Sequence, residues 1–182
     1  QYFTENIKLE PSEADCIYAG ILIDTNNFMT KTGVRTFEAA AYLRRCGAEV
    51  TRVRKLLRND MNSYKARAEV VRHAEVYKGA FAISVCPGKM ESPTIVGAQA
   101  ADELLNIIGI KASFVLTEYN GRIYVSARSI DEVNVQLIME RMGGGGHINM
   151  AGAQLKDEEM EIAVIKLKET IDQMVKEGDI EI

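Results

Sequence analysis

Apolar and polar residues alternate along the C-terminal two thirds of the chain in a pattern that predicts strands and helices. Residues 81–85 form an apolar run typical of a buried strand, and residues 95–108 have the spacing of an amphipathic helix. The segments 112–119 and 122–128 flank Asn120 and Gly121, a sequence pair that favours a two-residue hairpin turn. Strands and helices therefore mix, and we expect the α/β class.

Four further elements complete this region. Residues 64–78 predict a helix that Gly79 ends, and Asp131 is a candidate cap for a second helix that continues to residue 142. A short strand over 153–156 precedes a terminal helix over 159–177, in which apolar residues recur at helical spacing.

The first sixty residues predict short helices. Ser12 can start a helix, and the apolar run 16–23 that follows fits either a buried helix or a buried strand. We favour the helix because of the cap, and expect further helices over 37–46 and 51–57.

A domain boundary falls near residues 58–62, which gives an N-terminal part, 1–60, and a second domain, 61–182. Sixty residues bury little surface, so we expect the N-terminal part to depend on other sequence or on the second domain. The chain starts at Gln1 rather than Met and soon enters a helix. We interpret it as a piece of a longer protein.

A run of four glycines, Gly143, Gly144, Gly145 and Gly146, leads directly into His147. It follows a helical pattern rather than joining polar segments, which is unusual for a flexible linker. Glycine lets backbone N–H groups approach an anion closely, so the run is a candidate phosphate cradle with an imidazole beside it. A plain loop or a hinge is the alternative, and neither the G-x-G-x-x-G nor the P-loop spacing is present.

Two other positions are candidates for chemistry. Arg128 ends the second hairpin strand just before the helix that leads to the glycines, where its guanidinium could bind two phosphate oxygens. The alternative is an exposed arginine at a strand end. Asp24 ends the first apolar element within a polar cluster, where an aspartate is either a turn or cap residue or part of a cleft.

Composition narrows the function classes. The chain is 47% hydrophobic and 26% charged, with a net charge of −4 and a sequence pI of about 5.4, which disfavours binding to duplex DNA. No apolar run approaches the roughly 20 residues of a membrane-spanning helix, so we expect a soluble, cytoplasmic chain. Three scattered cysteines without a C-x-x-C pattern indicate reduced thiols that pack in the interior.

The motifs taken together resemble a known family. The sequences Ser-Ala-Arg-Ser at 126–129, Asn-Val-Gln at 134–136 and the glycine run with His147 resemble the DHH-associated domain of DHH-family phosphodiesterases. Residues 19–28 and 32–40 resemble the end of the DHH catalytic domain itself. The resemblance covers essentially the whole chain and is strongest to the GdpP-type cyclic-di-AMP phosphodiesterases of bacteria.

The resemblance implies a fold and an activity. It implies the end of an α/β DHH domain followed by a mixed-sheet α/β domain that binds substrate. Such enzymes hydrolyse cyclic di-AMP to linear pApA with two Mn²⁺ ions, which activate water and neutralise developing charge. It also implies membrane anchorage of the parent protein at the inner face of the cell membrane. A homodimer is one possible assembly.

The resemblance also assigns roles to single residues. Asp24 matches the last metal-binding aspartate, and Arg128, the four glycines and His147 match substrate-holding positions. Ser126 and Asn134 belong to the same substrate-binding motif. The earlier metal-binding motifs of the family, including Asp-His-His, are absent, so we expect the chain alone to be inactive.

Two other functions fit the same residues. The substrate could be a short oligoribonucleotide or pApA, because a phosphate site would bind any of these ligands. Alternatively, the second domain could be a sensor that binds a nucleotide without chemistry.

Overall fold

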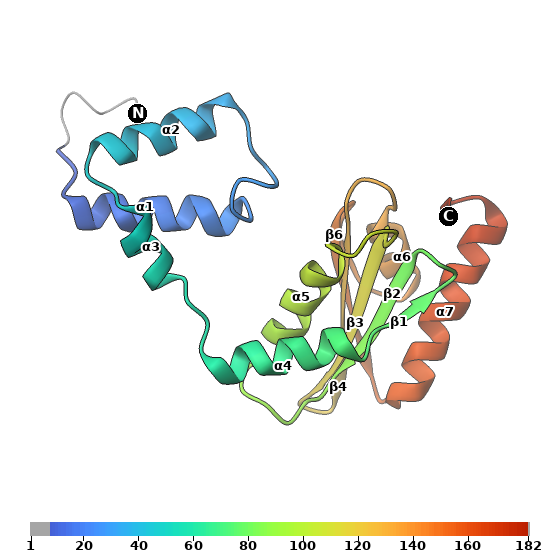
Figure 1. Ribbon diagram of the computed structural model, residues 1–182. Helices are drawn as coiled ribbons and strands as arrows, with labels where there is room; N and C mark the ends of the chain where they lie inside the picture. Colours follow the sequence, from blue (N-terminus) through green and yellow to red (C-terminus); the bar gives the residue numbers. More distant parts are fainter. Residues whose placement is uncertain (1–7, 182) are drawn as a thin grey trace. The chain divides into compact units, whose positions relative to one another are not determined.

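The computed structural model describes residues 8–181, and Gln1 lies outside this range. The chain separates between Asn59 and Asp60 into two compact units. The first unit is helical and the second combines a six-stranded sheet with four helices (Figure 1). The predicted mixture of strands and helices in one α/β chain is confirmed.

The first unit consists of α1 (Pro11–Asp24), α2 (Val34–Arg45) and α3 (Val50–Leu56). Its small core is formed by the fully or nearly fully buried residues Ala14, Leu43 and Ala48. The apolar run 16–23 is helical as favoured, but only Ala19 within it is buried, and Ile17 and Ile23 are 47% and 67% exposed.

The starting residue of α1 also differs from the prediction. Glu10 precedes the helix, and its backbone N–H donates to the Glu13 carboxylate at 2.9 Å. Ser12 lies inside the first turn, after Pro11. Proline at the first helical position needs no hydrogen-bond partner for a backbone N–H, which explains why the helix starts there.

Asp15 joins α1 to α3. Its buried carboxylate accepts a hydrogen bond from the backbone N–H of Glu49 at 2.7 Å and forms an ion pair with Arg52. The Arg52 hydrogen bond, followed by that from Glu49, lowers the pKa of Asp15 below its usual value of 3.8. The ionised carboxylate is therefore the form that the fold favours.

The second unit contains a single mixed sheet in the order β1-β2-β3-β4-β6-β5. β2 and β3 are parallel, and every other neighbouring pair is antiparallel. The strands are β1 (Glu75–Tyr77), β2 (Phe81–Cys86), β3 (Ala112–Tyr119), β4 (Arg122–Ser129), β5 (Gly145–His147) and β6 (Met150–Lys156).

Helices lie on both faces of this sheet (Figure 1). α6 (Val135–Arg141) and α7 (Met160–Glu177) cover one face over the main hydrophobic core. α4 (Met61–Arg72) and α5 (Pro93–Leu104) pack on the other face, where a second cluster joins them to β2 and β3. On that second face, β6 and β5 carry exposed residues, including Met150, His147 and Gln154.

Two local predictions are corrected by the structure. The helix expected over 64–78 is α4, which starts after the cap Asp60 and ends before His73, and β1 occupies the rest. Asp131 does not cap α6. Instead, the Asn134 side chain accepts hydrogen bonds from the N–H groups of Gln136 and Leu137, at 3.1 and 3.4 Å.

Candidate functional site

Strand alternation sorts the residues of β4 onto two faces. Ile123, Val125 and Ala127 are buried in the core beneath α6 and α7. Because successive side chains point to opposite faces, Tyr124, Ser126 and Arg128 lie on the other face. β6 has the same alternation, with Ala151, Ala153 and Leu155 in the core and Met150, Gly152 and Gln154 on the opposite face.

Pairing across β4, β6 and β5 arranges these outward residues in rows, because directly opposed residues share a face. The first row is Arg128, Met150 and His147; the middle row is Ser126, Gly152 and Gly145; the third row is Tyr124 and Gln154. We call the surface formed by these three rows the trough. Arg128 and His147 are two strands apart, which places their Cα atoms about 10 Å from each other on the same face.

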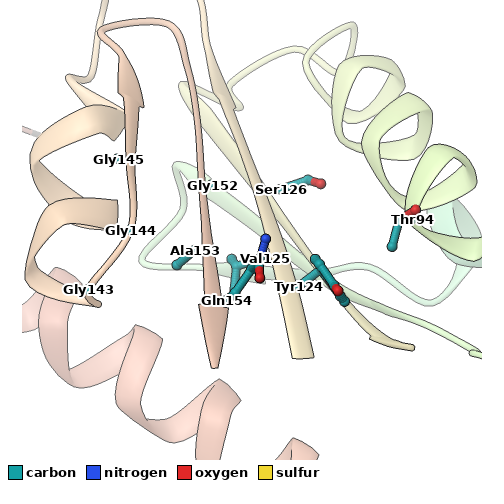
Figure 2. Close-up of a pocket in the computed structure, with 10 residues that line it drawn as sticks. All are labelled: Thr94, Tyr124, Val125, Ser126, Gly143, Gly144, Gly145, Gly152, Ala153 and Gln154. Atoms are coloured by element: carbon teal, nitrogen blue, oxygen red, sulfur yellow. The ribbon is translucent and has the colours of Figure 1, made fainter. Parts of the chain in front are cut away.

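A pocket of about 540 Å³ lies over the middle and third rows. The glycine run borders it on one side, and Thr94 of α5 faces it from the other (Figure 2). The lining residues are Thr94, Tyr124, Val125, Ser126, Gly143, Gly144, Gly145, Gly152, Ala153 and Gln154. The volume of the pocket is in the usual range for small-molecule sites.

The four glycines of the run have different structural roles. Gly143 follows the end of α6 with φ +79°, a conformation that favours glycine. A Cβ at Gly144 would lie 2.1 Å from the carbonyl oxygen of Gly152, and a Cβ at Gly146 would lie 2.5 Å from the Cα of Ala151. These two glycines therefore let β5 approach β6 closely. A Cβ at Gly145 would meet nothing within 4 Å.

The backbone amides of the run only partly support the phosphate cradle. The N–H groups of Gly143 and Gly144 donate to the carbonyl oxygens of Glu140 and Met139, at 3.0 and 2.8 Å. They close the last turn of α6 and are not free for an anion. Any backbone contribution to phosphate binding must therefore come from Gly145 or Gly146, and a contact between substrate and any of the four glycines stays a prediction.

His147 is exposed and is held in place by the hairpin between β5 and β6. The turn carbonyl of Ile148 accepts a hydrogen bond from Val135 N–H at 2.9 Å, and that of Asn149 accepts one from Ser129 N–H at 3.1 Å. The turn is thus anchored to the start of α6 and the end of β4. This anchoring holds the His147 backbone in its place in the first row.

Arg128 already has a partner on α5. Its Nε donates to Asp102 Oδ1 at 2.8 Å, and its Nη1 donates to the Ala127 carbonyl oxygen at 3.0 Å. The Arg128 side chain is only 12% exposed, whereas the Asp102 side chain is 48% exposed. The guanidinium is therefore held in a fixed orientation at the edge of the trough, with an acidic group next to it.

Ser126 and Asn134, the two other residues of the substrate-binding motif, differ in position. Ser126 lies in the middle row and lines the pocket, so its hydroxyl can reach a ligand there. Asn134 caps α6 with its side-chain oxygen, which gives it a structural role whether or not it contacts substrate. Sequence reasoning did not single out Tyr124, Gln154, Gly152, Thr94 or Asp102. The alternation along β4 and β6 is the one signal that could have indicated the first three.

Asp24 is the last residue of α1 and is exposed. The buried Thr25 caps the helix: its hydroxyl donates to the Ile21 carbonyl oxygen at 2.6 Å and accepts from Phe28 N–H at 3.0 Å. The exposed position is compatible with a metal ligand or with a simple helix end. Its role in metal binding remains a prediction.

The manganese centre implied by the resemblance does not fit the residues that the structure describes. Within residues 8–181, no three histidine, cysteine, aspartate or glutamate side chains are grouped so that they could hold one metal ion. Asp24 alone is too few ligands for the two-ion centre expected above. We derive no catalytic step through manganese.

The sequence that forms most of this sheet, the glycine run and His147 matches a known family model. Residues 78–177 match the DHHA1 domain. The chain therefore belongs to the DHHA1 domain family, as the sequence resemblance implied.

Among the described residues, no helix is both long and apolar enough to cross a membrane.

The particular relatives are consistent with this class. The chain is 42% identical over 172 residues to the cyclic-di-AMP phosphodiesterase GdpP of Geobacillus thermodenitrificans, covering 94% of this chain and 26% of that protein. It is also 42% identical over 161 residues to the cyclic-di-AMP phosphodiesterase PdeA of Listeria monocytogenes, covering 88% and 24%. The chain thus spans about a quarter of the length of these relatives.

A solved structure shows the same fold. An exopolyphosphatase-related protein from Bacteroides fragilis superimposes with a TM-score of 0.82 at 20% sequence identity. The match covers 95% of this chain and 52% of that structure. At this level of identity the match concerns the fold and not the substrate.

Proposed function

We propose that this chain provides the substrate-binding part of a DHH-family phosphodiesterase whose substrate is cyclic di-AMP. The similarity to GdpP and PdeA, whose names give that activity, supports the substrate class. The chain's own contribution is to bind and orient the nucleotide. Hydrolysis of the phosphodiester to linear pApA is then a property of the longer protein.

The first row of the trough supports this proposal most directly. Arg128 and His147 face the same side of the sheet at the same level, on either side of Met150. Because their Cα atoms lie about 10 Å apart on one face, the guanidinium and the imidazole can approach the same phosphate group from opposite sides. The pocket next to this row leaves room for the rest of a nucleotide.

Binding of cyclic di-AMP to the whole chain, measured by calorimetry, tests the proposal. We expect Arg128→Ala and His147→Ala each to weaken binding at least ten-fold. The physical reason is that a hydrogen bond to a charged phosphate contributes about 1.5–3 kcal/mol. His147 is exposed, so His147→Ala should change the melting temperature little. Arg128 is 12% exposed and paired with Asp102, so Arg128→Ala should lower the melting temperature, and its affinity is compared at a temperature where the variant is folded.

Matched controls are available in the same unit. His73 is the other histidine of the chain, and Arg72 precedes it at the end of α4. Both are exposed, so His73→Ala and Arg72→Ala change the same residue types away from the trough. Equal loss of affinity in the control and trough variants would contradict the proposal.

Competition binding against cyclic di-AMP distinguishes a linear oligonucleotide substrate from the proposed one. If pApA or a short RNA displaces cyclic di-AMP at a much lower concentration than cyclic di-AMP itself, the substrate is a linear oligonucleotide. The sensor alternative concerns the longer protein. It predicts that the longer protein binds cyclic di-AMP through Arg128 and His147 and releases no pApA.

A further inference from the structure

The middle row of the trough is almost bare. It consists of Ser126, Gly152 and Gly145, of which two have no side chain. On one side lies the first row, with Arg128 and His147, and on the other lies the third row, with Tyr124 and Gln154. Residues two apart on a strand are separated by about 6.6 Å, so the two outer rows are about 13 Å apart. The trough is therefore a slot with a flat floor.

The two ends of this slot differ in charge. None of the residues that line the pocket carries a formal charge, and neither Arg128 nor His147 is among them. The pocket lies over the bare floor and the third row. Arg128, with Asp102 paired to it, and His147 lie beyond the pocket at the first row. A ligand that fills both parts is thus anionic at one end and uncharged at the other.

The uncharged end has groups suited to a planar heteroaromatic ring. Tyr124 belongs to a tilted aromatic pair with Tyr119, at 6.4 Å between ring centroids, and Tyr119 is 41% exposed. Aromatic side chains stack on nucleobases without strong sequence preference. Gln154 is exposed and has both an amide donor and a carbonyl acceptor, which together match the N6 and N7 edge of adenine. The glycine floor lets a flat ring lie against the backbone.

We propose that the slot between the first and third rows is a nucleobase subsite, with Tyr124 contacting the ring and Gln154 selecting adenine. This inference rests on the proposed function, because the phosphate at the first row sets where the base lies. The hydroxyls of Thr94 and Ser126 line the same pocket and can satisfy further polar atoms of the nucleoside. The subsite makes base identity, and not only phosphate charge, part of recognition.

Calorimetry of the whole chain with AMP, GMP and ribose 5-phosphate tests the subsite. Ribose 5-phosphate has the same phosphate and sugar but no base. We expect AMP to bind at least ten-fold more tightly than ribose 5-phosphate, and more tightly than GMP. Gln154→Ala should weaken AMP binding about ten-fold and leave ribose 5-phosphate binding unchanged. Gln173→Ala, an exposed glutamine on α7, is the matched control.

The outcomes separate the two proposals. If AMP and ribose 5-phosphate bind equally and Gln154→Ala affects neither, the base subsite is wrong. The phosphate site would still stand if Arg128→Ala abolished binding of both ligands. If neither ligand binds while cyclic di-AMP does, the subsite is wrong and the proposed function stands. If cyclic di-AMP does not bind either, or if Arg128→Ala changes nothing, the proposed function fails and the subsite fails with it. Loss of ribose 5-phosphate binding on Gln154→Ala would also overturn the subsite, since the effect would then not depend on the base.

Discussion

At the scale of single residues, the four consecutive glycines are not equivalent. Gly144 and Gly146 have no room for a side chain, since an added Cβ would overlap backbone atoms of β6. Gly143 has a positive φ that disfavours a side chain. Gly145 has open space and no such constraint. The fold therefore explains why Gly143, Gly144 and Gly146 are glycine. It does not explain Gly145, where the missing side chain would leave space for a ligand.

This difference gives a prediction. Gly145→Ala adds a methyl group to the floor of the trough without a clash in the protein, so the melting temperature should stay within about 2 °C of the unchanged chain. Cyclic di-AMP binding should fall several-fold, because the methyl group occupies the slot. Gly144→Ala should instead destabilise the fold by roughly 1–3 kcal/mol through overpacking.

Calorimetry and thermal unfolding of the two variants provide the check. Gly33→Ala is a suitable control, since its Cβ would also meet nothing within 4 Å. Unchanged binding in Gly145→Ala would mean that the bare floor has no part in ligand contact.

The ion pair between Arg128 and Asp102 has a testable consequence at the same scale. A carboxylate next to Arg128 repels a bound phosphate, by about 0.8 kcal/mol for charges some 7 Å apart in a largely aqueous environment. Asp102→Asn keeps the shape of the side chain and removes the charge. We therefore expect affinity for AMP to rise about four-fold at low salt, with a smaller gain at high salt.

Asp157→Asn is the control, because it makes the same charge change at an exposed residue between β6 and α7, whereas Asp102 lies on α5. An equal gain in both variants would point to net charge rather than to the ion pair. A loss of affinity in Asp102→Asn would show that holding the guanidinium matters more than the repulsion.

At the scale of elements, the parts that sequence reasoning missed are the two shortest strands. β1 and β5 have three residues each, too few to show alternation, and β5 is built mainly from glycine. Their existence depends on pairing with β2 and β6, which only the assembled sheet provides. The long hairpin of β3 and β4, by contrast, was predictable, because an Asn-Gly turn joins two eight-residue strands, of which β3 is an almost continuous buried run and β4 alternates.

The contact between α1 and α3 gives a prediction about pH. The fold lowers the pKa of Asp15 below its ordinary value of 3.8. The ionised carboxylate therefore stabilises the fold fully at pH values above 3.8, and this stabilisation is lost as the pH falls through the pKa of the folded state. Asp15→Asn should therefore speed hydrogen exchange in α1 and α3 at pH 7, and the difference from the unchanged chain should shrink near pH 3.

Hydrogen exchange of peptides from α1 and α3, followed by mass spectrometry at both pH values, measures this effect. The exchange of α7 serves as an internal control, since it lies in the other unit. A difference that is as large at pH 3 as at pH 7 would show that the charge of Asp15 is not the cause.

At the scale of the whole molecule, the two units have unequal cores. The hydrophobic cluster of the first unit contains three buried residues, whereas the main cluster of the second unit extends from β2 to α7. The candidate binding site lies entirely in the second unit, on strands β4, β6 and β5. Whatever the first unit contributes through Asp24 is a separate question from ligand binding in the trough.

The sequence allowed part of this site to be predicted. Ser126, Arg128, the glycines and His147 belong to motifs that are visible in the chain itself. The partner of Arg128 was not visible, because Asp102 is 26 residues away and meets it only through the packing of α5 on the sheet. Tyr124 and Gln154 could not be identified as site residues from the sequence, because only the register of β4 and β6 places them in one row.

The central claim is that the trough binds a nucleotide, and backbone amide chemical shifts during titration with cyclic di-AMP test it most directly. The account predicts that the largest shift changes fall on Ser126, Arg128, Gly145, His147 and Gly152, and that they saturate together with one dissociation constant. The absence of any saturating change, or changes concentrated on α7 while the glycine amides stay still, would contradict it.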